Sequence, residues 1–245
     1  MIENIEIREC TSLEELGACV DLQRAVFRLP EVEISPVRHF IVTRNAGGFT
    51  LGAFSGRELI GFVLSVPAFL REEGAFYSHM TAVRNDFQSA GIGARLKWAQ
   101  RIHALELGVR FIKWTFEPVK SRNAYFNLEK LGAVVADYQR NFYGTDYAST
   151  PGIGLASDRL FAEWHLESEK VCALANGGQY SETTCPALTI EATTDWEALL
   201  NESPEGALNE QIRIRSKFED AFEKKLICRG FRRDPLHPEY LLYTK

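Results

Sequence analysis

Gln88-Ser89-Ala90-Gly91-Ile92-Gly93 is the stretch that decides the fold: it follows an apolar strand and leads directly into a basic amphipathic helix. The first N–H groups of a helix have no partner within the helix, and the helix dipole is positive at that end, so an anion binds there readily. Because Gly91 and Gly93 lack a Cβ atom, the backbone can approach a diphosphate closely. Three basic residues of the helix are expected to add positive charge: Arg95, Lys97 and Arg101. This order of elements predicts a phosphate-binding loop.

A glycine-rich turn before a helix is common, so the surrounding residues have to identify the loop. The stretch lacks the Gly-Lys-Ser/Thr ending of a P-loop. It also lacks the third glycine and the acidic ribose-binding residue of a dinucleotide-binding fold. A nucleotide hydrolase would need oxygen ligands for Mg²⁺, and we find no such residue set in the sequence.

The segment from Tyr77 to Gly132 resembles the GNAT superfamily of acyl-CoA-dependent N-acyltransferases. The matching elements, in chain order, are the family's fourth strand ending at Ala82-Val83, its pyrophosphate loop at 88–93, its third helix at 94–107, its fifth strand at 109–116, and the following helix at 121–131 with the ending Glu129-Lys130-Leu131-Gly132. The resemblance implies an α/β (α+β) fold, with a mixed, mostly antiparallel twisted sheet flanked by helices.

The residues outside this segment fit the same fold. Ile5–Glu9 alternates like a strand, and Ser12 stands at the start of a capping box for a helix that continues to about Phe27. Two β-rich runs, 49–54 and 59–69, flank a turn sequence and predict an antiparallel hairpin. The helix that begins at Ala94 is expected to bury one stripe of apolar residues: Leu96, Ala99, Ile102 and Leu105.

We expect a GNAT-like domain over residues 1–168 and a C-terminal α/β extension over 169–245 that packs on it. The extension is predicted to contain a strand at 188–192, a helix from about 204 to 227 and a closing strand at 240–243. This order echoes the end of the first domain, so one interpretation is a degenerate second GNAT-like half. A plain α+β extension is the alternative.

Composition limits the classes of partner. The chain has 245 residues, 45% hydrophobic and 25% charged, with a formal net charge of −5, so bulk electrostatics would not attract it to nucleic acid or to an anionic membrane. The longest apolar run, 59–70, is too short to span a bilayer. Residues 1–7 lack the basic and apolar regions of a secretory signal, and the five cysteines are widely spaced without a Cys-x-x-Cys pair. We therefore expect cytoplasmic residence, reduced thiols and no metal site.

The resemblance implies which residues hold acetyl-CoA or a related acyl-CoA. The main chain of the fourth strand would bind the pantetheine arm, and the loop and helix start would bind the pyrophosphate. The helix after the fifth strand would supply further contacts, from Ser121 at the family's usual asparagine position, or from Lys120, Arg122 or Asn123. The cofactor-binding residues implied in this way are Thr81, Ala82, Val83, Gln88, Ser89, Ala90, Gly91, Ile92, Gly93, Ala94, Ser121 and Asn123.

Acyl transfer to an amine needs a base, because a lysine-like amine with a pKa of about 10.4 is mostly protonated near neutral pH and only the free base attacks a thioester. His79 on the fourth strand is the first candidate, since a pKa near 6.5 suits proton transfer, and Glu117 after the fifth strand is the second. The family's general-acid tyrosine corresponds to Leu128 here. Tyr125, one helical turn earlier, is the alternative acid.

These observations predict an N-acyltransferase that moves an acetyl or related acyl group from acyl-CoA to a primary amine, by direct transfer and without a metal. The acidic chain favours a small metabolite as acceptor over a basic protein tail. The missing tyrosine leaves a second interpretation open, in which the protein binds acyl-CoA as a regulatory or structural module without turnover.

Overall fold

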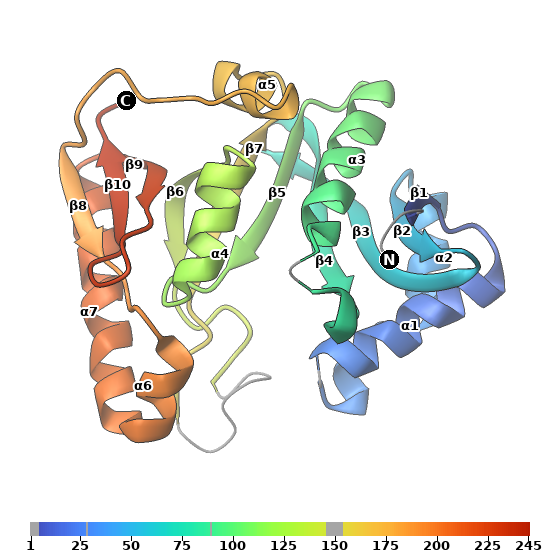
Figure 1. Ribbon diagram of the computed structural model, residues 1–245, viewed down its shortest axis with the longest axis horizontal. Coiled ribbons are helices and arrows are strands. Elements are labelled where there is room, and N and C mark those ends of the chain that lie inside the picture. The colour runs from blue at the N-terminus through green and yellow to red at the C-terminus, as the bar shows by residue number, and fades with distance from the viewer. Residues whose placement is uncertain (1–4, 28, 89, 146–153) are drawn as a thin grey trace. The chain divides into compact units, whose positions relative to one another are not determined.

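The computed structural model describes residues 5–27, 29–88, 90–145 and 154–245 (Figure 1). The chain forms two compact units, unit one from Met1 to Lys113 and unit two from Trp114 to Lys245. The division falls inside strand β5 (Phe111–Phe116). It separates two compact bodies and does not test the domain boundary expected at residue 168, which stays a prediction.

The described residues of unit one form four complete strands, three α-helices and two short 3₁₀ turns. They are β1 (Ile5–Glu9), α1 (Leu13–Phe27), η1 (Glu31–Glu33), α2 (Val37–Asn45), β2 (Phe49–Ser55), β3 (Glu58–Leu70), β4 (Glu73–Val83), η2 (Asn85–Phe87) and α3 (Ile92–Glu106). The strands pair antiparallel in the order β1-β2-β3-β4. β4 then pairs in parallel with the start of β5, at Phe76–Ile112 and Tyr77–Lys113. The predicted strand, helix and hairpin order of this part is confirmed.

Side chains of β3 alternate between two helical layers. Phe62 and Leu64 belong to the apolar cluster that α1 and α2 form with the sheet. Gly61 and Ser65 meet α3 instead: a Cβ atom on Gly61 would lie 3.2 Å from Leu96 Cδ1, and Ser65 Oγ accepts a hydrogen bond of 2.7 Å from Gln100. Helices α1 and α2 therefore cover one face of this sheet and α3 covers the other.

The start of α1 confirms the capping box. The Ser12 hydroxyl accepts from the Glu15 N–H at 3.2 Å, and the Glu15 carboxylate accepts from the Ser12 N–H at 3.1 Å. Two N–H groups at the helix start are satisfied in this reciprocal way.

Unit two contains the end of β5 and the remaining elements. They are α4 (Ser121–Tyr125), the π-helical turn η3 (Phe126–Lys130), β6 (Val134–Gln139), β7 (Arg159–His165), α5 (Glu169–Ala175), β8 (Leu188–Glu191), α6 (Trp196–Glu202), α7 (Pro204–Glu223), β9 (Ile227–Arg232) and β10 (Glu239–Tyr243). The strand order is β5-β7-β6-β9-β10-β8. β6 pairs antiparallel with both β7 and β9, and β10 pairs antiparallel with both β9 and β8.

The C-terminal extension is built into the sheet of unit two. β9 pairs with β6 at Cys228–Val135, and the Phe231 N–H donates to the Glu129 carboxylate at 2.7 Å. The hydroxyl of the fully buried Tyr240 donates to the Pro118 carbonyl at 2.7 Å. Backbone pairing and buried side chains together attach the extension.

Two predicted segments differ from the structure. The long extension helix ends at Glu223, not near Ile227, and residues 227–232 form β9. Lys225 has a positive φ of 60°, which ends the helical turn, and the β-branched and aromatic residues that follow suit a strand. The helix expected over 121–131 is α-helical only to Tyr125 and continues as the π turn η3.

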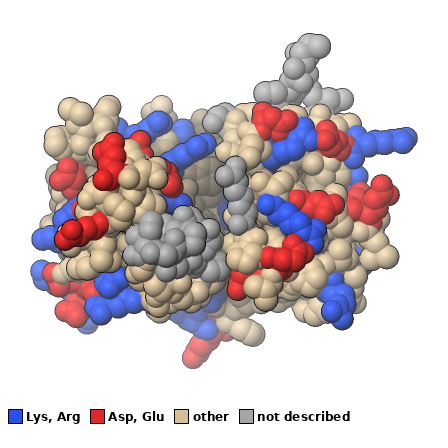
Figure 2. All heavy atoms as spheres, turned by 90° about the horizontal axis from the view of Figure 1, so that it is seen from below, with Lys and Arg blue, Asp and Glu red and all other residues tan. Residues whose placement is uncertain are grey.

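On the face that Figure 2 presents, acidic and basic side chains are interspersed. Of the helices in the described residues, none is long and apolar enough to cross a membrane.

Candidate functional site

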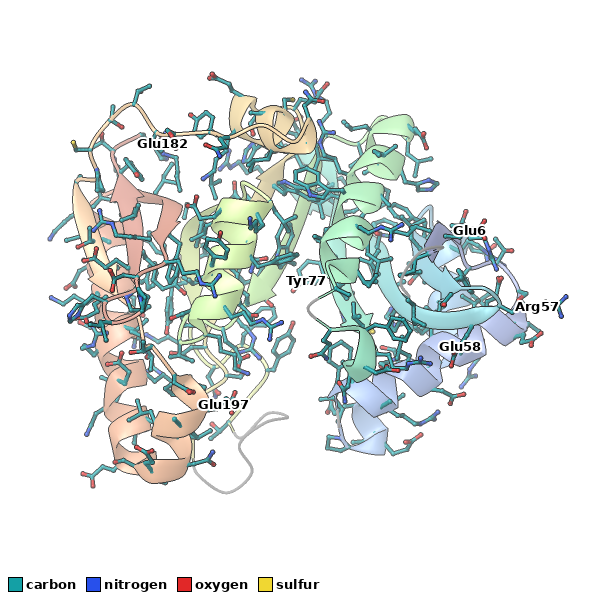
Figure 3. The ribbon with its side chains drawn as sticks, viewed as in Figure 1. Glu6, Arg57, Glu58, Tyr77, Glu182 and Glu197 are labelled. Carbon is teal, nitrogen blue, oxygen red and sulfur yellow. The ribbon has the colours of Figure 1, made fainter. Side chains whose placement is uncertain are left out.

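Hydrogen bonds and ion pairs of Arg84 and Gln88 hold the loop between β4 and α3 in place. The Arg84 N–H donates to the Ile60 carbonyl at 2.9 Å, and the Arg84 guanidinium pairs with Asp86 and with Glu58, which is labelled in Figure 3. Gln88 Nε2 donates to Asn85 Oδ1 at 2.9 Å and to the Val83 carbonyl at 3.3 Å. Gln88 therefore shapes the loop with its side chain. Ser89, one of the expected cofactor-binding residues, lies outside the described residues.

The N-terminus of α3 carries no side-chain cap. Gly91 occupies the N-cap position with φ 78° and ψ 3°, a left-handed conformation that favours glycine, and no acidic residue stands in the first turn. The first helical bond runs from the Arg95 N–H to the Gly91 carbonyl at 3.0 Å, so the N–H groups before Arg95 lack an acceptor inside the helix. Gly91 is exposed, Gly93 and Ala94 are half-buried, and Ile92 is buried. This geometry suits an anion.

The basic residues of α3 are placed differently from the prediction. Arg95 Nη2 donates to the Ile5 carbonyl at 2.7 Å, so its guanidinium lies against β1. Lys97 is buried, with 3% of its surface exposed. The predicted apolar stripe is wrong at Ile102, which is 55% exposed, while Leu96 is buried and Ala99 and Leu105 are half-buried. Lys97 and Gln100, which lie outside the predicted stripe, are buried as well. Arg95 is exposed and Lys97 is buried, so of these two residues only Arg95 places a charge near solvent at the helix start, with its guanidinium bonded to β1. The helix dipole and the N–H groups of the first turn also favour an anion there.

Lys97 belongs to a buried polar network between α3 and the sheet. Its Nζ donates to the Ser78 hydroxyl at 3.0 Å, the Ser78 hydroxyl donates to Gln100 Oε1 at 3.3 Å, and Gln100 Nε2 donates to the Ser65 hydroxyl at 2.7 Å. Burial lowers the pKa of the Lys97 amine well below its usual value, because removing the ammonium from water disfavours the charged form.

This lysine predicts a specific pH dependence of stability. The unfolded chain binds one proton more than the folded chain between the lowered pKa of Lys97 and its ordinary pKa of about 10.4, so folding stability should rise with pH in that window by about 1.4 kcal/mol per pH unit from this group. The Lys97→Met variant should unfold at higher temperature than the wild type at pH 7, and the difference should shrink toward pH 10. Thermal unfolding of both proteins at several pH values measures it, and a difference that is independent of pH would show that Lys97 is charged in the folded state.

His79 lies on a β-bulge of β4. The register between β3 and β4 passes from Leu64–Met80 to Ser65–Ser78, so His79 is an extra residue without a partner on β3. Bulges re-aim side chains and are frequent near active sites. The imidazole is exposed by area, but protein atoms crowd it and reduce its hydration, which lowers the pKa of His79 to about 4, with a smaller contribution from His39. The pKa of His79 therefore differs from the value near 6.5 expected from the sequence.

His79 lies beside a second histidine that no sequence pattern indicated. His39, on α2, places its ring centroid 5.4 Å from that of His79, with an angle of 71° between the two ring planes. Burial lowers the pKa of the half-buried His39 as well. Forty residues separate the two histidines in the sequence, and no spacing pattern connects them.

Glu117, the second candidate base, lies in unit two and pairs with Lys120 at 2.8 Å. It lines a small cavity of about 20 Å³, room for about one water molecule, together with residues that include Trp196 and Gln211 of the extension. Gln211 Nε2 donates to the Ala156 carbonyl at 2.7 Å, and its buried Oε1 has no hydrogen-bond partner among the described residues. Within its own unit, Glu117 is an ion-paired carboxylate beside a polar cavity.

The residues of α4 are only partly available to a ligand. The Ser121 hydroxyl donates to the Thr193 carbonyl of the extension, so its proton is already used. Tyr125 is half-buried and lies between two cations, with Lys130 Nζ 5.5 Å and the Arg233 guanidinium 5.3 Å from the ring centroid. Leu128 is fully buried and Asn123 is half-buried. These contacts give the ring of Tyr125 a packing role.

Among the described ranges, no three histidine, cysteine or acidic side chains gather closely enough to hold a metal ion.

Comparison with known proteins identifies the fold. No family model matches the sequence, and no curated protein matches it. Solved structures do match. The ribosomal-protein-S18-alanine N-acetyltransferase from Escherichia coli is 14% identical, with a TM-score of 0.52, over 74% of this chain and 99% of that one. The chain has the GNAT fold.

Two further neighbours support this assignment. A GNAT family acetyltransferase from Elizabethkingia anophelis with acetyl-CoA bound is 19% identical, with a TM-score of 0.51, over 67% of this chain and 99% of that one. An aminoglycoside 6'-acetyltransferase type Ii is 17% identical, with a TM-score of 0.52, over 66% of this chain and 98% of that one. The GNAT fold of these neighbours fits within about two thirds to three quarters of the chain, and the C-terminal extension lies beyond it.

Proposed function

We propose that the protein is an acyl-CoA-dependent N-acyltransferase that moves an acetyl or related acyl group to a primary amine of a small metabolite by direct transfer. The observation that carries the proposal is the uncapped N-terminus of α3, with Gly91 in the left-handed conformation, at the end of the β4 loop of a GNAT fold. Helix N–H groups and the positive end of the helix dipole would bind the pyrophosphate. The pyrophosphate site comprises Gln88, Ser89, Ala90, Gly91, Ile92, Gly93 and Ala94.

The main chain of Thr81, Ala82 and Val83 would bind the pantetheine arm, with Ser121 and Asn123 as further contacts. His79 would take the proton of the attacking amine, with Glu117 as the alternative base, and Tyr125 would donate to the departing thiolate. The substrates would then be an acyl-CoA and a small amine. We also propose cytoplasmic residence, which agrees with the widely spaced cysteines.

The acceptor is not set by the fold. The neighbours' names give a ribosomal protein's alanine in one case and aminoglycosides in another. One fold can host many acceptors, because the acceptor contacts lie on side chains that vary between proteins.

A non-catalytic acyl-CoA-binding module is the second candidate. Leu128 stands at the family's acid position, and the two cations over the ring of Tyr125 favour a packing role for that residue. Such a module needs the phosphate loop but neither an acid nor a base.

Calorimetry and a thiol-release assay separate the two. Acetyl-CoA should bind at least about tenfold more tightly than acetyl-pantetheine, which lacks the phosphates, because charge-assisted hydrogen bonds contribute about 1.5–3 kcal/mol each and tenfold corresponds to about 1.4 kcal/mol. A panel of primary amines should then elicit CoA release above the hydrolytic background. Tight binding without amine-dependent release would favour the module. The absence of saturable binding to any CoA species would overturn both functions.

A further inference from the structure

His39 and His79 form a pair of imidazoles on two elements of unit one. α2 supplies His39 and the bulge of β4 supplies His79, and the 5.4 Å separation of the ring centroids places the nearest ring atoms within reach of one small bridging group. The extra residue of the bulge faces the α2 side, while its neighbour Ser78 turns to α3 and bonds Lys97. The bulge thereby brings the two rings together.

Neither imidazole ring has a hydrogen-bond or ion-pair partner among the residues that the structure describes. The described residues therefore leave the hydrogen-bonding capacity of the ring nitrogens unused. Loss of hydration is the largest cause of the lowered pKa of both rings, and the pKa of His79 is lowered further by His39. Over residues 5–27, 29–88 and 90–113, no carboxylate forms an ion pair with either ring.

The absence of a carboxylate from this pair matters for amine chemistry. A carboxylate beside an amine stabilises the ammonium form and opposes its deprotonation, whereas poorly hydrated, neutral surroundings disfavour the ammonium. A neutral imidazole nitrogen accepts a hydrogen bond from the free base without that penalty. An imidazole that is a weak base can still take a proton from nitrogen after attack, since the nitrogen of the tetrahedral adduct carries a positive charge and is more acidic.

We propose that His39 and His79 together bind the acceptor, and that this pair selects a weakly basic primary amine, such as an α-amino group, over a strongly basic alkylamine. The inference rests on the proposed function, because it names the class of acceptor for that reaction. In the transfer step the amine nitrogen bonds to the acyl carbon, the bond from that carbon to the CoA sulfur breaks, and His79 accepts the proton that nitrogen loses.

Two amines of similar size test the selection. Glycinamide carries an α-amino group, with a pKa of about 8, and n-propylamine is lysine-like, with a pKa of about 10.4, so their free-base fractions at pH 7 differ about 250-fold. We expect kcat/KM for glycinamide to exceed that for n-propylamine by about 100-fold or more. Equal values, or a preference for n-propylamine, would mean that the site binds the ammonium and would overturn the proposal.

Variants of His39 test the residue. His39→Glu introduces a carboxylate and should reduce the glycinamide to n-propylamine ratio at least tenfold. His39→Gln keeps a neutral acceptor and should preserve the ratio. His39→Phe keeps an aromatic ring without nitrogen and should raise the KM for the amine about tenfold, with the KM for acetyl-CoA unchanged. Circular dichroism and thermal midpoints establish that each variant is folded.

The outcomes separate this inference from the proposed function. If the wild type releases CoA with amines but all three His39 variants match it, His39 does not bind the acceptor and the inference fails while the function stands. If the wild type binds acetyl-CoA but uses no amine, the catalytic function fails and the inference fails with it.

Discussion

The Gly91→Val variant is expected to lose acetyl-CoA affinity by tenfold or more, which corresponds to at least about 1.4 kcal/mol. A Cβ atom at Gly91 would meet no protein atom within 4 Å, so the added side chain would stand in open space at the start of α3, where the anion site is proposed. In addition, the φ of 78° is unfavourable for any residue with a Cβ, which would displace the N-cap from the position in which the first turn faces an anion. Isothermal titration calorimetry with acetyl-CoA measures the loss.

Gly56 provides the matched control. It lies in the turn between β2 and β3 with φ 61°, and a Cβ atom there would also meet nothing within 4 Å. Gly56→Val should therefore carry a similar backbone penalty, on the order of 1–2 kcal/mol in stability, while acetyl-CoA binds as it does to the wild type. Equal affinity of the Gly91→Val and Gly56→Val variants for acetyl-CoA would remove the phosphate site from the start of α3.

The His79→Gln variant is expected to lower kcat by about 100-fold or more, with the dissociation constant of acetyl-CoA unchanged within about twofold. Positioned general bases contribute on the order of 10²–10⁴ to rate, and glutamine keeps the approximate size of the side chain without a group that can be protonated near neutral pH. Steady-state kinetics with the best amine of the panel, and calorimetry for acetyl-CoA, provide the two measurements.

The pH profile adds a test of the imidazole itself. Because the pKa of His79 is lowered to about 4, the ring is neutral at every pH above about 5, and its protonation should cause no inflection near 6.5. We expect kcat/KM of the wild type to rise with pH until the amine substrate is itself deprotonated. An inflection near 6.5 that His79→Gln abolishes would mean that the pKa of His79 is that of an ordinary histidine before the amine binds.

A second histidine variant serves as a control, because it shows whether replacing any histidine by glutamine lowers kcat. His237 is exposed and pairs with Glu191 at 2.9 Å in unit two. His237→Gln should leave kcat unchanged. If His79→Gln also retains full activity, Glu117 becomes the leading candidate for the base.

The elements that could be predicted from the sequence are those with a local physical signature. The reciprocal bonds of Ser12 and Glu15, the turn at 55–58 and the glycines at the start of α3 depend on residues close in sequence, and the structure confirms each of these elements. The fold class could be predicted because these elements occur in the same order in the GNAT superfamily, and the solved structures confirm the fold.

The features that escaped prediction depend on contacts between distant residues. The bulge at His79 arises from the register of β4 against β3, which no local pattern specifies. Lys97 has the periodicity of an exposed position, yet Ser78 supplies it with a buried partner from another element. The pairing of His39 with His79 needs α2 and β4 to be adjacent. The roles of the expected site residues stay predictions for the experiments above.

The pairing of β9 with β6 determines whether the edge of β6 is exposed. A protein ending at residue 168 would retain β6 but lose Cys228, which pairs with Val135. The main-chain N–H and C=O groups on that edge of β6 could then pair with a strand of another molecule. An unpaired edge strand of this kind favours self-association of the protein. β9 therefore covers an edge of β6 that a chain without the C-terminal extension would leave unpaired.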